Sequence, residues 1–316
     1  MKEHITDKKI SVIIACYNEA ENIPAMYKRL TEAFVHITPH YEFVFVDNAS
    51  RDNSAELYQS LCEQDQRVSA ILMSRNFGSS DTSYSAGTEY ASGDAVIWID
   101  GDIQDPPELI SQFVQKWLEG YEVVYGVRSK RKMGIFLGFA YKTFYRLFRR
   151  YSYIEMPMHA GDFCIIDRKV ADVLNSMPER DRFMRGLRAW VGFKHTGVEY
   201  TRLERAAGRS STNLGLYIRV AKKGLISFSY APLSFISNIA FVAMIATMIA
   251  ILAFPFFAIF YPAPRGFLTL IVVILFIGSV QFCILAILGE YMAKIFEEVK
   301  ARPKYIIRHI INNHRI

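Results

Sequence analysis

Short apolar runs alternate with amphipathic helical stretches over the first 125 residues. The apolar runs are rich in β-branched and aromatic residues, and mostly polar segments separate them. This alternation predicts βαβ units and a mostly parallel sheet, so we expect an α/β fold. The predicted strands are Ile10–Cys16, Phe43–Asp47, Ala70–Ser74 and Ala95–Asp100.

Polar clusters follow each predicted strand directly. In open parallel sheets, ligands bind outside the carboxyl ends of the strands, so these clusters are the place to look for chemistry. After the fourth cluster, the order Asp105-Pro106-Pro107-Glu108 predicts a new helix with Asp105 as its N-cap. The clusters are Tyr17-Asn18-Glu19, Asp47-Asn48-Ala49-Ser50, Arg75-Asn76-Phe77-Gly78 and Asp100-Gly101-Asp102.

Two long apolar runs, 233–261 and 267–288, lie near the C-terminus. Each exceeds the ~20 residues that cross a bilayer, and a short loop separates them, so they predict a transmembrane hairpin. Basic residues are concentrated after the second run, which places both flanks of the hairpin in the cytoplasm. The N-terminus lacks the apolar stretch of a secretory signal, so we expect it in the cytoplasm as well.

Basic amphipathic segments precede the hairpin. Residues 134–153 and 212–226 combine aromatic or apolar residues with Lys and Arg, which favours helices at the membrane interface. For the first segment, a helix packed on the core is an equally good interpretation. The expected organisation is a large cytoplasmic domain over 1–228, a hairpin over 229–292 and a basic cytoplasmic tail over 293–316.

The charge balance narrows the partners only slightly. Lys and Arg outnumber Asp and Glu by 37 to 31, which suits anionic lipid, nucleotide phosphates or nucleic acid equally well. No glycine-rich dinucleotide motif or P-loop follows any predicted strand. Phosphates must then be held by a metal ion and by cationic side chains. The candidates are Arg128, Lys142, Arg205 and Arg209.

Carboxylates at strand ends are the main candidates for chemistry. Asp100 and Asp102 suit Mg²⁺ or Mn²⁺, and Gln104 has the same parity and could be a third ligand. The alternative interpretation is that Asp100 and Asp102 are solvated residues of a turn and bind no metal ion. Asp47 could bind a nucleobase or ribose, or it could cap a helix, a role that neighbouring polar residues could also fill. Asp162 could act as a base or support a metal ligand.

Together these motifs resemble the family-2 glycosyltransferases of the GT-A type. The resemblance is strongest to the polyprenyl-phosphate branch, which includes bactoprenol glucosyltransferases and dolichyl-phosphate mannose synthase. It implies a Rossmann-like GT-A catalytic domain. Besides the four clusters at the strand ends, the resemblance rests on five further segments. They are Tyr125-Gly126-Val127-Arg128, Asp162-Phe163, Arg182 through Leu187, Gly289-Glu290-Tyr291 and Arg302 through Tyr305.

The resemblance also implies roles for individual residues. The implied catalytic residues are Asp102 and Asp162, and the implied ligands for Mg²⁺ or Mn²⁺ are Asp100, Asp102 and Gln104. The implied nucleotide-binding residues are Ala15, Tyr17, Glu19, Asp47, Arg75 and Asp100. Arg205 and Arg209 would contact the donor phosphates, and Arg128 and Lys142 the acceptor phosphate.

The implied reaction moves a sugar, such as glucose or an N-acetylhexosamine, from a UDP-sugar to polyprenyl (undecaprenyl) phosphate with inversion. It would occur at the cytoplasmic face of the inner membrane, in a multi-pass protein that can form homo-oligomers and does not bind nucleic acid. Three departures from the family pattern, at Asn48-Ala49, Ser79 and Ser211, leave the choice of sugar open. The rival interpretations are a processive polysaccharide synthase, which needs more membrane helices, and a catalytically silent membrane scaffold.

Overall fold

The computed structural model describes residues 4–128, 154, 160–202, parts of 228–249, and 266–312. Both predicted interface helices lie outside these residues, as does most of the first apolar run. The predicted phosphate-binding residues Lys142, Arg205 and Arg209 also lie outside them.

All four predicted strands are present and form the centre of an eight-stranded sheet. The strand order is β7-β5-β6-β4-β1-β2-β3-β8. The four predicted strands run parallel, but β6 pairs antiparallel with both β4 and β5, and β8 pairs antiparallel with β3. The sheet is therefore mixed, and the expectation of parallel strands holds mainly for its centre. The strands are β1 (Ile10–Cys16), β2 (Tyr41–Asp47), β3 (Val68–Met73), β4 (Ala95–Asp100), β5 (Val123–Arg128), β6 (Ala160–Asp167), β7 (His195–Tyr200) and β8 (Ile307–Ile311).

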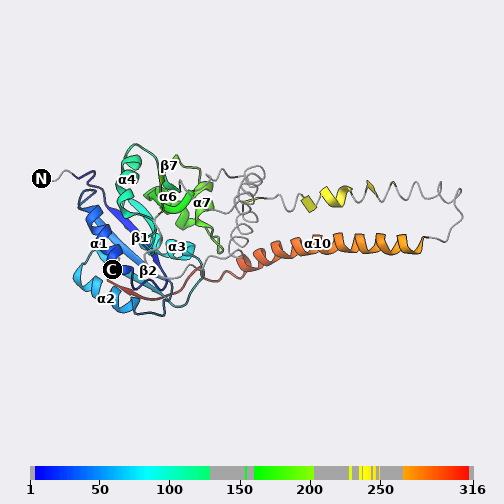
Figure 1. The fold of residues 1–316 in the computed structure, drawn as a ribbon, viewed down its shortest axis with the longest axis horizontal. Helices are drawn as coiled ribbons and strands as arrows, with labels where there is room; N and C mark the ends of the chain where they lie inside the picture. The colour runs from blue at the N-terminus through cyan, green and yellow to red at the C-terminus, as the bar shows by residue number, and fades with distance from the viewer. Residues whose placement is uncertain are drawn as a thin grey trace.

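Helices cover both faces of this sheet and make a three-layer sandwich (Figure 1). Successive side chains of a strand point to opposite faces, so Ile13 and Ile14 of β1 belong to different core clusters. One face packs on α1 (Ile23–Phe34), α2 (Ser54–Gln64) and α4 (Ile110–Leu118). The other face packs on α3 (Ser80–Tyr90), α6 (Arg168–Ser176) and α7 (Met184–Trp190).

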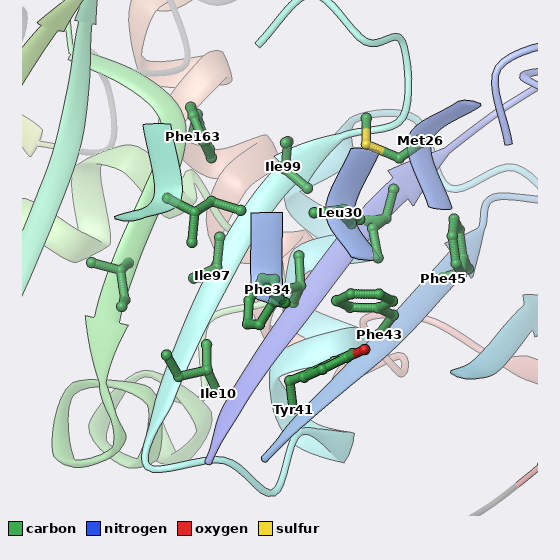
Figure 2. Close-up of a cluster of buried hydrophobic side chains, with 14 of the residues drawn as sticks. Ile10, Met26, Leu30, Phe34, Tyr41, Phe43, Phe45, Ile97, Ile99 and Phe163 are labelled. Atoms are coloured by element: carbon green, nitrogen blue, oxygen red, sulfur yellow. The ribbon is translucent and has the colours of Figure 1, made fainter. Parts of the chain in front are cut away.

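The apolar stripe of α1 explains its place in the first core cluster. Met26, Leu30 and Phe34 recur at helical spacing and are fully buried against the sheet (Figure 2). The Phe34 ring lies 4.9 Å from the ring of Tyr41 and 5.4 Å from that of Phe43, centroid to centroid. This packing holds β1 and β2 in place, and their carboxyl ends carry two of the polar clusters.

A long apolar helix, α10 (Phe267–Val299), runs away from the sandwich (Figure 1). Its segment Phe276–Val299 has a mean hydropathy of 1.6 and is not buried against the rest of the chain. By length and composition this segment can cross a membrane, and it is the one helix with that property in the described part of the chain. The second predicted apolar run lies within α10, but the helix continues beyond Leu288 to Val299.

The predicted basic tail contributes a strand to the sheet of the sandwich. It contains β8, which pairs with β3 in the register Met73↔Ile307 to Ala70↔Ile311. The side chain of Asn312 extends this pairing by donating to the carbonyls of Gln66 and Val68, at 3.1 and 2.7 Å. β8 thereby covers the edge of β3, whose unpaired N–H and C=O groups would otherwise be exposed.

The last turns of α10 are fastened to the loop before α7. The Lys294 ammonium pairs with the Asp181 carboxylate. The Glu298 carboxylate accepts from the backbone N–H of Arg180 at 2.9 Å. Lys304, beyond the helix, donates to the Met177 carbonyl at 2.7 Å. The long apolar helix is thus joined to the sandwich by side-chain contacts as well as by the sheet.

Candidate active site

The loop after β4 lies unusually close to β1. The backbone N–H of Gly101 donates to the carbonyl of Ala15 at 2.9 Å. A Cβ at position 101 would lie 2.6 Å from the Cys16 Sγ, so only glycine lets the loop approach this closely. The next turn contains Ile103 with φ of 59°, a left-handed conformation that strains a β-branched residue by about 1–3 kcal/mol. Strain of this kind is concentrated at functional sites.

Three carboxylates gather around one guanidinium at this edge of the sheet. Arg202, just after β7, places its Nη2 3.9 Å from Asp100 Oδ2 and 3.7 Å from Asp102 Oδ2. Its Nε lies 3.2 Å from Asp105 Oδ1. The structure therefore brings Asp100 and Asp102 together, as predicted, and adds Asp105 and Arg202 to them.

The prediction that Asp105 caps a helix is wrong. The helical turn that follows is η1 (Pro107–Leu109), with Pro106 at its N-cap position and no side-chain cap. Asp105 is 1% exposed and instead accepts a hydrogen bond from the Tyr200 hydroxyl. It also lies 3.6 Å from the Nη2 of Arg128, a predicted phosphate ligand. Buried partners from β5 and β7 outweigh the capping role, and Arg128 is thereby held next to the carboxylate cluster.

Among the carboxylates of this cluster, Asp100 has a pKa that is raised far above its ordinary value. Burial, followed by the charges of Asp102, Asp105 and Asp162, raises its pKa to about 7, although a hydrogen bond of 2.7 Å from the Tyr84 hydroxyl opposes the rise. Crowded carboxylates favour either protonation or a cation among them. The Arg202 guanidinium supplies positive charge at this position.

The carboxylate cluster suits a metal ion that shares its ligands with substrate. Among the described residues, no group of three or more His, Cys, Asp or Glu side chains is arranged to hold a metal ion alone. Mg²⁺ commonly takes only one or two carboxylates and completes its shell with water and substrate phosphates. The backbone N–H of Gln104 donates to Asp102 Oδ1 at 3.2 Å, which fixes that carboxylate on the loop. The metal assignment therefore stays a prediction, and the donor set fits it.

The loops after β1 and β2 are joined to each other. The backbone N–H of Asn18 donates to the Ser50 Oγ at 2.8 Å, and its side-chain oxygen accepts from the backbone N–H of Arg51 at 2.8 Å. Tyr17, beside Asn18, is 41% exposed. The predicted nucleotide residues Ala15, Tyr17 and Glu19 therefore lie along a segment that contacts the loop of Asp47.

Asp47 does not cap the helix that follows it, whose N-cap position is Asn53. Its carboxylate accepts from the backbone N–H of Ser50 at 2.9 Å and so closes its own loop. The residue that reaches the first turn of α2 is Asp52, which accepts from the backbone N–H of Ser54 at 3.2 Å. The capping alternative for Asp47 is thereby removed, and its role in nucleotide binding stays a prediction.

Arg75 lines a cavity that is separate from the other predicted nucleotide-binding residues. Its guanidinium lies over the Phe77 ring, 4.1 Å from the centroid, and it lines a cavity beside α10. None of the other predicted nucleotide residues lines that cavity. The loop that carries Arg75 still contacts the loop after β2, because the backbone N–H of Phe77 donates to Asn48 Oδ1 at 2.9 Å.

Asp162, on β6, is held by a bidentate ion pair. Arg185 of α7 donates through Nε and Nη2 at 3.1 and 2.6 Å. Burial alone would raise the pKa of Asp162, but the charge and hydrogen bonds of Arg185 outweigh it, and the pKa lies below its ordinary value. Asp162 is therefore ionised at neutral pH. Its charge also contributes to the raised pKa of Asp100, so the two belong to one electrostatic cluster.

Several residues of this cluster had no predicted chemical role. They are Tyr84, Asp105, Arg185, Tyr200 and Arg202. Arg185 lies within a motif that carries the family resemblance, so that motif is the available signal for it. The other four residues join the cluster through contacts between segments that are far apart in the chain and meet at the carboxyl ends of the strands.

Comparison with known proteins identifies the family. The model of glycosyl transferase family 2 matches residues 11–174. The chain belongs to glycosyl transferase family 2. It is therefore a glycosyltransferase, as the sequence motifs predict, and the scaffold interpretation is set aside. The match covers β1 through β6 and most of α6, and so includes the carboxylate loop and Asp162.

Full-length relatives extend the similarity beyond the family domain. The chain is 38% identical to the glycosyltransferase YkcC of Bacillus subtilis, covering 100% of this chain and 98% of that protein. It is also 38% identical to the SfII prophage-derived bactoprenol glucosyl transferase of Shigella flexneri, covering 95% and 97%. Among solved structures, glucosyl-3-phosphoglycerate synthase of Mycobacterium tuberculosis is 18% identical, with a TM-score of 0.49, covering 69% of this chain and 79% of that one.

Proposed function

We propose that this glycosyltransferase moves a sugar from a UDP-sugar to a polyprenyl phosphate at the cytoplasmic face of the membrane. The observation that carries the proposal is the position of the carboxylate cluster near the C-terminal turns of α10, the long apolar helix. Tyr84 of α3 donates to Asp100, and the next residue, Ser85, lines a cavity that α10 borders. Relatives named bactoprenol glucosyl transferases align over nearly the whole chain, which supports a polyprenol acceptor. The choice of UDP rests on the family resemblance of the loops after β1 and β2.

In the proposed reaction an oxygen of the lipid phosphate attacks the anomeric carbon. The bond from that carbon to the nucleotide diphosphate breaks, and the diphosphate leaves with the electron pair. A phosphate monoester has a second pKa of about 6, so it is already ionised and needs no strong base. Asp162, ionised and fixed by Arg185, orients the reactants. Arg128 and Arg202 neutralise the phosphates of acceptor and donor.

The remaining predicted cations would complete these phosphate contacts. Lys142 is assigned to the acceptor, and Arg205 and Arg209 to the donor, on the family resemblance alone. Arg202 ends the described segment that leads toward Arg205 and already lies beside the carboxylates. This proximity supports a donor-phosphate role for the segment.

Asp100, Asp102 and Gln104 would hold a divalent metal ion together with the donor diphosphate. When bound, that ion supplies stabilisation of the charge that develops on the leaving group. The protein's own contribution is to keep the two carboxylates on a rigid loop, through the contact of Gly101 with β1 and the backbone donor to Asp102. The crowding of three carboxylates around Arg202 supports a cation at this loop.

The place of β8 in the sheet supports the proposed transmembrane hairpin. β8 and the strands of the catalytic domain belong to one sheet, so both ends of the intervening segment lie on the same side of any membrane. If α10 crosses the bilayer, the chain before it must cross as well. The apolar run 233–261 is long enough for that crossing. Two crossings of the inner membrane, with the sandwich on the cytoplasmic side, satisfy this condition.

The test uses the full chain in detergent with undecaprenyl phosphate, Mg²⁺ or Mn²⁺, and a panel of nucleotide sugars. Sugar-linked lipid should form with a UDP-sugar and should be lost in Asp102→Ala. The matched control is Asp172→Ala, because that aspartate is 61% exposed on α6. Transfer from a GDP-sugar or dTDP-sugar but from no UDP-sugar would refute the donor, and transfer only to a soluble acceptor would refute the lipid.

A further inference from the structure

A basic cavity of about 460 Å³ lies where α10 meets the sandwich. Its walls come from α3 and the loop before it, the loop 180–182, the last turns of α10 and residues 302–304. Six cationic side chains line it, against three acidic ones. The cations are Arg75, Arg180, Arg182, Lys294, Arg302 and Lys304.

The positive charge in this basic cavity is only partly compensated. Lys294 is paired with Asp181, but Arg75, Arg180 and Arg302 form no ion pair with any residue that the structure describes. Cations crowded in this way attract an anion, and Arg groups match the oxygens of phosphate particularly well. The basic cavity therefore suits a phosphate group.

The ionisation of Lys304 is consistent with this crowding. Burial lowers the pKa of Lys304, and the charges of Arg182 and Arg180 lower it further. An anion placed among these three side chains would offset the repulsion between them. Binding of a phosphate would therefore raise the pKa of Lys304 again.

A second cavity, the apolar cavity, has a volume of about 430 Å³ and adjoins the first. The two cavities share Asp181 and Lys294. The apolar cavity also borders α10, through Tyr291 and Ile295. Its other apolar lining residues include Phe183, Leu187, Trp190 and Phe228.

We propose that the two cavities bind one anionic phospholipid of the membrane, with its phosphate in the basic cavity and an acyl chain against the apolar one. Basic pockets beside transmembrane helices are suited to anionic headgroups. Free phosphate would use only the basic cavity and leave Trp190, which lines the apolar cavity and is 51% exposed, in contact with water. A lipid satisfies both cavities at once.

This lipid is distinct from the sugar acceptor. None of the carboxylates Asp100, Asp102 and Asp105 lines either cavity, so a phosphate bound there is not in contact with the cluster assigned to transfer. The inference requires α10 to lie in a membrane but does not rest on the identity of the donor or acceptor. The bound lipid would fix the orientation of the sandwich on the membrane surface.

Trp190 offers a direct probe. It is 51% exposed and lines the apolar cavity, whereas Trp98 and Trp117 are 1% and 5% exposed in the sandwich. The full chain is placed in phosphatidylcholine nanodiscs with increasing fractions of phosphatidylglycerol that carries bromine on its acyl chains, because bromine quenches tryptophan fluorescence on contact. Quenching should saturate at a lower fraction for this lipid than for brominated phosphatidylcholine, and Trp190→Phe should remove it.

The double variant Arg180→Gln, Arg302→Gln tests the headgroup site. Each basic side chain near a membrane contributes about fivefold in affinity for anionic lipid, so the apparent affinity should fall by about 25-fold. Lys28→Gln with Arg51→Gln is the matched control, because both side chains are exposed and line neither cavity. The control should behave as the parent chain.

Several results would overturn the proposal. Equal quenching of the parent chain by the two brominated lipids would overturn it. This comparison needs no variant, so it stands even if the double variant fails to fold. A double variant that matches the control would remove the headgroup site. Loss of the phosphatidylglycerol preference on adding inorganic phosphate, at matched ionic strength, would assign the basic cavity to free phosphate. Tighter binding of polyprenyl phosphate than of phosphatidylglycerol would assign both cavities to the acceptor.

Discussion

Replacing Asp100 with asparagine should stabilise the protein above neutral pH. Burial and the neighbouring carboxylates raise the pKa of Asp100 from its ordinary 3.8 to about 7. Between these two values the unfolded chain has released the proton and the folded chain has kept it. The free energy of unfolding therefore falls as pH rises from about 4 to about 7 and stays low above that. Asparagine carries no charge and is free of this penalty, and its amide oxygen can still accept from Tyr84.

The size of the effect follows from the same shift. A change of about three pKa units corresponds to at most about 4 kcal/mol. The Asp100 side chain is 28% exposed, so solvent screening should reduce this to about 2 kcal/mol. Asp100→Asn should accordingly be more stable than the parent by about 2 kcal/mol at pH 8 and should match it at pH 4.

The assay is chemical denaturation of the full chain in detergent, with a chelator present to exclude divalent ions. Asp172→Asn is the control, because its carboxylate is 61% exposed and should change stability little at either pH. In the converse experiment, adding Mn²⁺ at pH 8 should stabilise the parent and leave Asp100→Asn unchanged. A variant with the same stability as the parent at pH 8, or a difference that does not vary with pH, would refute the electrostatic reasoning.

Three further changes should destabilise the fold by separate mechanisms, the first two measured by denaturation. Arg185→Gln leaves the Asp162 carboxylate without its bidentate partner and should cost about 2–3 kcal/mol at pH 7, and less at pH 4, where the unpaired carboxyl is protonated. Gly87→Ala would drive a methyl group into Ile13 in a closed core, at about 1–3 kcal/mol, and an unchanged stability would contradict that packing. Deleting 306–316 removes β8 and should expose the β3 edge, seen as aggregation or faster amide exchange in β3.

The strands and the carboxylate loop were predictable because they depend on local patterns. Apolar β-branched runs form strands wherever both faces are buried, and β1 and β4 begin and end where the runs do. Asp100 and Asp102 could be paired from spacing alone, since both lie on one short loop. Their roles in metal and nucleotide binding come from the family resemblance, because the pattern of apolar and polar residues does not indicate a role.

The rest of the site could not be predicted because it depends on distant contacts. Asp105 follows a capping pattern, yet it is buried by Tyr200 and Arg128, which lie on different strands. Arg202 reaches the cluster only because β7 pairs with β5 at the edge of the sheet. Local propensity competes with such tertiary contacts and loses. β8 differs from these, because Ile307–Ile311 contains three isoleucines and so favours a strand, but its pairing with β3 is a distant contact that the local pattern does not reveal.

The position of β8 also explains how the long apolar helix comes to lie on the same side of the sheet as the carboxylate cluster. Ile307 pairs with Met73, the last residue of β3, so the chain arriving from α10 enters at the carboxyl edge of the sheet. Seven residues, 300–306, connect the helix to that point, and an extended chain of this length spans at most about 25 Å. Asp100 ends β4 at the same edge. Had β8 entered beside the amino ends of the strands, the apolar helix would lie at the opposite edge of the sheet from the cluster. The observed register instead places the end of α10 and the carboxylates on one side of the sheet, as the proposed transfer to a lipid phosphate requires.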